Sequence, residues 1–124
     1  MTVRVTVRVY VPSTSAGLRV LVADGVLPAD EVAPAGPITA PGEDEEAEYA
    51  ALMTAADASA ALVAERGEPG RRRVVVVAEP ADPGRPPTLA EVVSVHLDVE
   101  DRDEGADPDD DLAWFAPEEL AHLR

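Results

Sequence analysis

The ten residues from Thr2 to Val11 alternate between polar and apolar side chains without a fault. A period of two in β-branched residues predicts a strand with one buried and one polar face. A strand buried on both faces would instead be a continuous apolar run. We therefore expect a sheet that helices cover on one side and that is open on the other. Pro12 is expected to end this strand.

The next part of the chain predicts two helices. Ser13 or Thr14 can cap a short helix that stops at Gly25, because their hydroxyl oxygens accept bonds from free backbone N–H groups. A longer helix is expected over residues 43–66, since the acidic residues at its start favour a helix N-terminus. Four prolines in residues 26–42 predict a loop, in which only Ile38-Thr39 hints at a short strand.

Further strands are expected in the second half. The run Val74–Val77 is apolar on both faces, which is typical of a central strand. Residues 92–99 predict another strand, and residues 112–115 a short strand or an extended docking segment. Together these elements predict one domain over residues 1–124, an α/β (α+β) sandwich. We expect a mixed or antiparallel sheet of three to five strands with two helices on one face.

Acidic residues dominate the charge, which is −15 for the whole chain. Residues 43–70 hold eight acids against one arginine, and residues 98–111 hold nine against one. Such a surface repels phosphate, which argues against binding to nucleic acid or anionic membrane and favours a basic or cationic partner. We expect residues 98–111 to form a mobile acidic loop.

The absence of cysteine excludes disulfides and thiolate sites. Because no signal peptide and no apolar run of about 20 residues is evident, we expect a cytoplasmic protein. All basic residues are arginine, a bias typical of GC-rich genomes such as those of actinobacteria. No Gly-rich phosphate loop is present, and we expect no cofactor.

Four side chains form the best candidate for a ligand site. Arg4 and Arg8 share the polar face of the first strand, Arg72 precedes the central strand, and His96 lies on a later one. On neighbouring strands they could gather around a phosphate or carboxylate. The alternative is that these arginines pair with the protein's own acids.

Ser94, His96 and Asp98 would stand in a row on one strand face, with the composition of a nucleophile, a base and an orienting acid. Side chains two residues apart on a strand are ~6–7 Å apart, too far for direct hydrogen bonds. We therefore predict no catalytic residue. The acids that follow His96 could bind a hard cation, but their spacing does not fit an EF-hand, and no metal site is predicted.

Trp114 and Phe115 are two of the four aromatic residues and adjoin the acidic loop. If buried, they clamp the C-terminal segment onto the core. If exposed, they form an interaction hot spot.

Two resemblances bear on identity. Residues 112–120 resemble the segment that closes many Nudix hydrolases, but the defining Nudix box has no counterpart, so we reject that activity. Over nearly its full length the chain is similar to a family of small uncharacterised actinobacterial proteins, a domain of unknown function. The shared segments are Arg8–Pro12, Glu45–Leu52, Arg72–Ala78 (Arg-Arg-Val-Val-Val-Val-Ala), Val93–His96 and Trp114–Leu120.

The leading hypothesis is a non-enzymatic interaction or regulatory module that engages a basic or cationic partner. The partner would be a basic protein, and the chain could also form a homodimer. The alternative is a small enzyme or binder of an anionic metabolite, which would use the arginines and His96 on the open sheet face.

Overall fold

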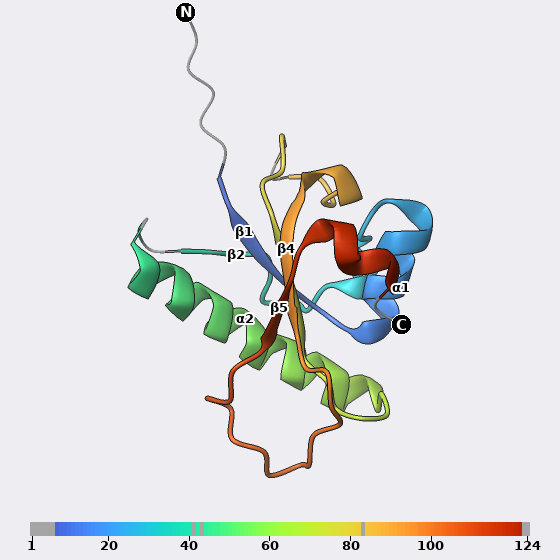
Figure 1. The fold of residues 1–124 in the computed structure, drawn as a ribbon, viewed down its shortest axis with the longest axis vertical. Coiled ribbons are helices and arrows are strands. Elements are labelled where there is room, and N and C mark those ends of the chain that lie inside the picture. Colours follow the sequence, from blue (N-terminus) through green and yellow to red (C-terminus); the bar gives the residue numbers. More distant parts are fainter. Residues whose placement is uncertain (1–6, 41, 43, 83, 123–124) are drawn as a thin grey trace, which may run out of the picture.

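The computed structural model describes residues 7–40, 42, 44–82 and 84–122. Five strands form one antiparallel sheet in the order β2-β1-β3-β4-β5 (Figure 1). The α+β class and the antiparallel sheet are therefore confirmed. The strands are β1 (Val9–Ser13), β2 (Ile38–Thr39), β3 (Val74–Ala78), β4 (Val92–Leu97) and β5 (Ala113–Phe115). The helices are α1 (Ser15–Asp24), α2 (Glu45–Arg66) and three 3₁₀ segments, Ala29–Glu31, Leu89–Glu91 and Pro117–His122.

Both α-helices begin and end at the residues whose chemistry predicts it. The Thr14 hydroxyl accepts a bond from the Gly17 N–H at 3.0 Å and caps α1, and Gly25 ends it with a φ of 78°. The Asp44 carboxylate caps α2 in the same way, and Gly67 ends that helix with a φ of 63°. Left-handed φ values of this kind favour glycine.

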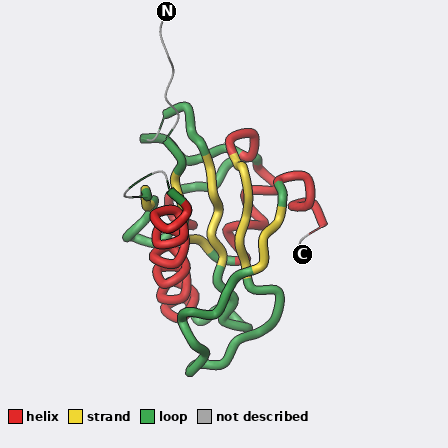
Figure 2. The backbone as a smooth tube through the Cα atoms, turned by 60° about the vertical axis from the view of Figure 1, so that its left-hand side comes forward, coloured by secondary structure: helices red, strands yellow, loops and turns green. Residues whose placement is uncertain are grey.

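The two helices lie on opposite faces of the sheet, so the expectation of both on one face is wrong (Figure 2). Leu18 and Leu21 of α1 pack with Val74 and Val76 of β3. The alanines of α2 pack on the other face, against Tyr10, Val75 and Val77. Because β3 is apolar on both faces, each face needs a cover.

The polar face of the first strand was expected to be open, but at Tyr10 this face of β1 is covered by α2. The Tyr10 side chain is 5% exposed and lies beneath Ala51 and Ala55 of α2. Because the alanine side chains of α2 are small, the Tyr10 ring fits between the helix and the sheet. Of the predicted first strand, residues 2–6 lie outside the described residues.

Pro12 does not end β1, which continues to Ser13 and pairs with β3. The Pro12 carbonyl accepts a bond from the Ala33 N–H, so this residue's polar backbone groups point away from β3. The proline nitrogen has no hydrogen to donate, but because it faces away from β3, no hydrogen bond between β1 and β3 is lost. Within the described part of the chain, no helix has the length and apolar character needed to cross a bilayer.

Candidate interaction site

The site is a recess on the face of the sheet that carries α2. The helix packs against β1 and β3 and leaves the same face of β4 and β5 uncovered. His96 of β4 stands opposite Trp114 of β5, and Ser94 stands opposite Val77 of β3. Between α2 and β5 lies a cavity of about 240 Å³, which we call the aromatic notch. Its lining residues are Arg8, Tyr10, Glu48, Tyr49, Leu52, Val77, Ser94, His96 and Trp114.

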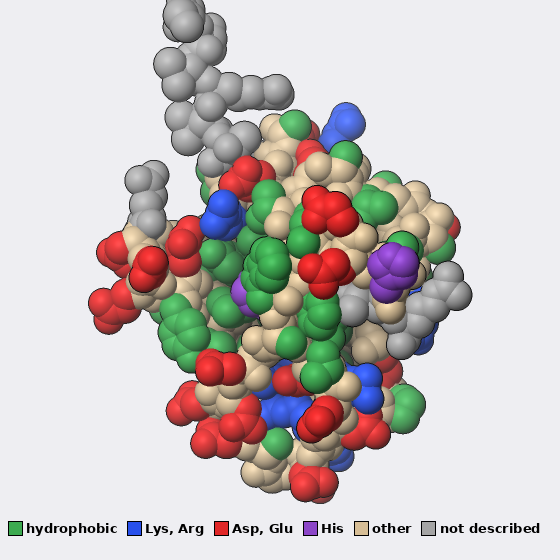
Figure 3. Space-filling model, in the orientation of Figure 1, with side chains coloured by type: hydrophobic (Ala, Val, Ile, Leu, Met, Phe, Trp, Pro, Cys, Tyr) green, Lys and Arg blue, Asp and Glu red, His purple; other side chains and the backbone are tan. Residues whose placement is uncertain are grey.

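Aromatic side chains set this recess apart from the rest of the surface. The chain has one tryptophan, two tyrosines and one phenylalanine, and all but Phe115 line the notch. Trp114 is 59% exposed and Tyr49 is 51% exposed, whereas Tyr10 forms the buried floor. In Figure 3, hydrophobic side chains gather over β5 and the adjacent part of α2, with acidic side chains around them. Two of the four aromatic side chains of this protein are thus exposed to solvent.

Carboxylates surround the rings. The Tyr49 hydroxyl donates a hydrogen bond to Asp111 Oδ1 at 3.4 Å. Desolvation, and after it the negative charges of Asp111 and Asp109, raise the pKa of Tyr49. Burial, followed by the charge of Glu48, raises the pKa of Tyr10. Carboxylates thus stand near both hydroxyls, although Arg8 opposes the effect of Glu48 on Tyr10.

Arg8 is the one cation among the residues that line the notch, and it is already paired. It contacts Glu79 at 3.0 Å and Glu48 at 3.2 Å. The hydrogen bond to Glu79 is the main reason why the pKa of Arg8 is raised. The alternative considered from the sequence, pairing with the protein's own acids, is thus realised for Arg8.

The structure does not gather the predicted arginines at one place. Val9 pairs with Ala78, so the beginning of β1 meets the end of β3. Arg72, which precedes β3, is therefore at the opposite end of the sheet from Arg8, where it pairs with Asp101 at 2.9 Å. Arg4 lies outside the described residues. Of the three predicted ligand-site residues that the structure describes, Arg8 and His96 line the same cavity and Arg72 does not.

Ser94 and His96 are closer than their spacing predicts. Ser94 Oγ lies 3.4 Å from His96 Nε2, so the inference that they are out of reach is wrong. The imidazole is long enough to lean along the strand. Burial lowers the pKa of His96, which keeps the ring neutral at pH 7. Asp98 does not contact the ring but binds Arg73 instead.

Trp114 and Phe115 have opposite environments, because neighbouring strand residues face opposite sides of a sheet. Trp114 borders the notch, and Phe115 packs against the core cluster beneath α1. From the sequence, the two were expected to share one environment. Tyr10, Tyr49 and Glu48 were not among the predicted site residues, although the Glu48-Tyr49 pair near the start of the predicted long helix was visible in the sequence.

Arg73 holds in place the acidic loop that leads to β5. Its side chain is 1% exposed and binds both oxygens of Asp98, at 2.8 and 2.9 Å. It also donates to the carbonyls of Pro108 and Asp110, at 3.2 and 2.9 Å. The loop thus has a buried anchor immediately before Ala113. Among the described residues, no three acidic or histidine side chains gather closely enough to hold a metal ion.

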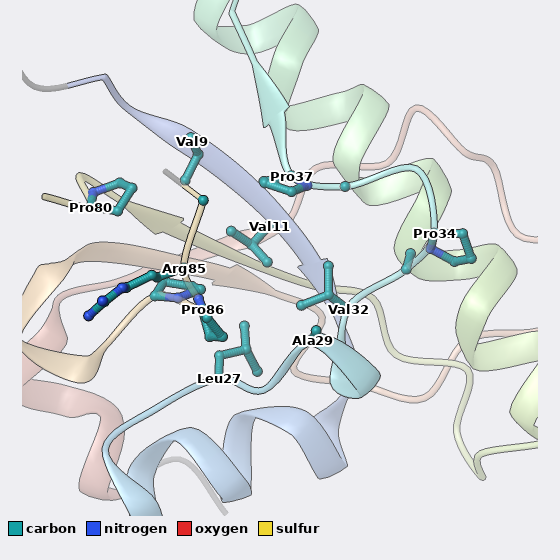
Figure 4. Close-up of a pocket in the computed structure, with 14 residues that line it drawn as sticks. Val9, Val11, Leu27, Ala29, Val32, Pro34, Pro37, Pro80, Arg85 and Pro86 are labelled. Atoms are coloured by element: carbon teal, nitrogen blue, oxygen red, sulfur yellow. The ribbon is translucent and has the colours of Figure 1, made fainter. Parts of the chain in front are cut away.

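A second cavity, of about 340 Å³, lies on the opposite face (Figure 4). Valines of β1 and Leu27 form its floor, and prolines from two loops form its walls. Its one charged lining residue, Arg85, extends away from Val11 and Leu27 and lies 3.6 Å from Asp82. Apart from Arg85, the described side chains that line this cavity are all apolar and offer few groups to orient a ligand, so the aromatic notch is the better candidate site.

Comparison with known proteins gives a family but no activity. No curated protein and no solved structure is significantly similar to this chain. One family model, described as a family of unknown function (DUF6912), matches residues 7–123, which include every strand and helix described above. The chain therefore belongs to the family of unknown function DUF6912.

Proposed function

We propose that this protein is a non-enzymatic interaction module that binds a cationic side chain of a basic partner in the aromatic notch. The observation that carries the proposal is the exposure of Trp114 and Tyr49 on either side of a recess whose surroundings are acidic. Large exposed aromatics beside a cavity are typical of binding surfaces.

An arginine or lysine side chain suits this recess for two reasons. A cation is attracted to the face of an indole or phenol ring, most strongly when it is partly shielded from water. Asp111, which accepts a hydrogen bond from the Tyr49 hydroxyl, is exposed, and none of the described arginines forms a salt bridge with it. It can therefore provide a counter-charge at the rim.

The charge around β5 would also attract such a partner. Residues 103–121 carry eight carboxylates and no arginine or lysine. A field of one sign increases the rate at which a partner of the opposite sign arrives, and salt weakens it. We expect an affinity that falls as the salt concentration rises.

An anionic metabolite has less support as the ligand. Arg8 and His96 do share the notch, but Arg8 already contacts two carboxylates and the ring of His96 is neutral at pH 7. Arg72 is at the other end of the sheet, beside Asp101. An anion would have to displace Glu48 or Glu79 from Arg8 while surrounded by further acids.

The source and location proposed here are an actinobacterial cytoplasm. Support comes from the composition, in which arginine provides all ten basic residues and cysteine is absent. A reducing compartment is compatible with a chain that has no disulfide.

The test uses a fluorescein-labelled peptide of nine residues that alternates arginine and threonine, with a second peptide in which glutamate replaces arginine. Fluorescence anisotropy should show binding of the arginine peptide alone. Trp114→Ala and Tyr49→Ala should each weaken it about tenfold, the effect of losing one aromatic contact of a hot spot. Val99→Ala is the matched control, because Val99 is exposed and apolar but does not line the notch. Equal binding by Trp114→Ala and the unmodified protein would refute the proposal.

A further inference from the structure

Within the described residues, the last strand of the sheet has an unpaired outer edge. β5 pairs with β4 on one side and is the final strand in the sheet order. In Figure 2, no described segment runs along its outer side. An unpaired edge presents backbone N–H and C=O groups that can pair with another extended chain.

The register identifies which residue presents those groups. The Asp98 N–H donates to the Arg73 carbonyl, so the polar backbone groups of Asp98 point toward β3, as do those of His96 two residues earlier. The backbone groups of Leu97 and Val95 therefore point toward β5, where they pair with Ala113 and Phe115. It follows that the N–H and C=O of Trp114, between these two, point outward from the sheet.

Trp114 thus combines two recognition elements in one residue. Its side chain borders the aromatic notch, and its backbone lies at the open edge. In an antiparallel pair, the residue that exchanges both hydrogen bonds with Trp114 would stand about 5.5 Å away, Cα to Cα, with its side chain on the same face. That face is the one on which the notch opens.

Charge selects the occupant of this edge. Asp109, Asp110 and Asp111 precede β5, and Glu118 and Glu119 follow it. A second copy of the chain would bring an identical acidic edge and a net charge of −15. Like charges brought together at an interface are unfavourable, whereas a basic segment is complementary.

We infer that the partner is an extended basic segment of another protein that adds antiparallel to β5, with an arginine or lysine directly opposite Trp114. This inference rests on the proposed function and specifies its geometry. One residue of the partner makes both hydrogen bonds to the Trp114 backbone and places its cationic side chain over the notch. Because β5 has three residues, the added strand is short and the complex is a transient one.

The test uses two N-methylated forms of the arginine–threonine peptide. In an extended peptide, alternate N–H groups point to the same edge, so the arginine and threonine amides point to opposite edges. Methylation of the arginine amides should weaken binding about tenfold, the loss expected when one backbone hydrogen bond is removed and the edge is blocked by a methyl group. Methylation of the threonine amides is the matched control and should leave the affinity unchanged.

Amide exchange gives a second readout. In the free protein the Trp114 amide should exchange faster than those of Ala113 and Phe115, which pair with β4. Addition of the peptide should slow exchange at Trp114 itself.

The outcomes separate the two proposals. If both methylated peptides bind as tightly as the parent, or are weakened equally, strand addition is refuted while binding in the notch stands. If the parent peptide binds equally well to Trp114→Ala, the proposed function fails and this inference fails with it.

Discussion

Replacing Arg73 with methionine should remove a large part of the free energy of unfolding. The guanidinium is 1% exposed and makes four side-chain hydrogen bonds, two of them to Asp98. Methionine fills the space of the aliphatic stem but leaves Asp98 with the Arg73 backbone N–H at 2.8 Å and Arg102 at 3.8 Å. The carboxylate of Asp98 is itself 9% exposed. A buried charge therefore loses its principal partner.

The magnitude follows from that geometry. Breaking a buried ion pair by removing one partner costs about 3–5 kcal/mol. The total free energy of unfolding of a domain is roughly 5–15 kcal/mol. Arg73→Met should therefore leave the protein only marginally stable. At an m-value of about 2 kcal/mol/M, a loss of about 4 kcal/mol lowers the urea midpoint by roughly 2 M.

Urea denaturation followed by circular dichroism measures this loss, and Arg72→Met provides the matched control. Arg72 is the neighbouring arginine, and its pair with Asp101 is exposed on both sides. Exposed pairs contribute about 0–1 kcal/mol. If the two variants unfold at the same urea concentration, the reasoning about the buried anchor is wrong.

Two further predictions concern buried polar groups beneath α2 and in β4. Ser59→Ala should lower the free energy of unfolding, measured by urea denaturation, by roughly 1–3 kcal/mol. The reason is that the Ser59 hydroxyl donates to the Ser13 carbonyl at 2.7 Å and accepts from the Val74 N–H at 2.8 Å. A free energy of unfolding equal to that of the unmodified protein would contradict this prediction. Burial lowers the pKa of His96 below its ordinary 6.5, so the unfolded chain takes up a proton first as the pH falls. The stability that the neutral ring provides is therefore present above pH 6.5 and decreases below it, toward the pKa of the folded state. His96→Gln should make the difference in unfolding free energy between about pH 8 and about pH 5.5 smaller, and an unchanged difference would contradict the assignment.

Local chemistry made the helices predictable. Thr14 and Gly25 bound α1, and Asp44 and Gly67 bound α2, because caps act within a few residues of the chain. The apolar run of β3 indicated a central strand for a similar reason. These features depend on near neighbours in the sequence.

The site depended on pairing between distant segments, which the sequence does not display. The antiparallel register places Glu79 beside Arg8 and separates Arg8 from Arg72. The register of β4 likewise places Asp98 beside Arg73, which binds its carboxylate. Trp114 and Phe115 were recognised as a pair, but the sheet had to be known before one could be assigned to the notch and the other to the core.

Trp114 is the single tryptophan of the chain, so its fluorescence reports directly on the notch. The decisive measurement is a titration with the arginine–threonine peptide and with its citrulline counterpart, which keeps the shape of arginine but lacks the charge. We predict a saturable change in Trp114 emission with the arginine peptide and none with the citrulline peptide. The same change with both peptides would show that the notch does not recognise a cation, and no change while anisotropy reports binding would place the site elsewhere.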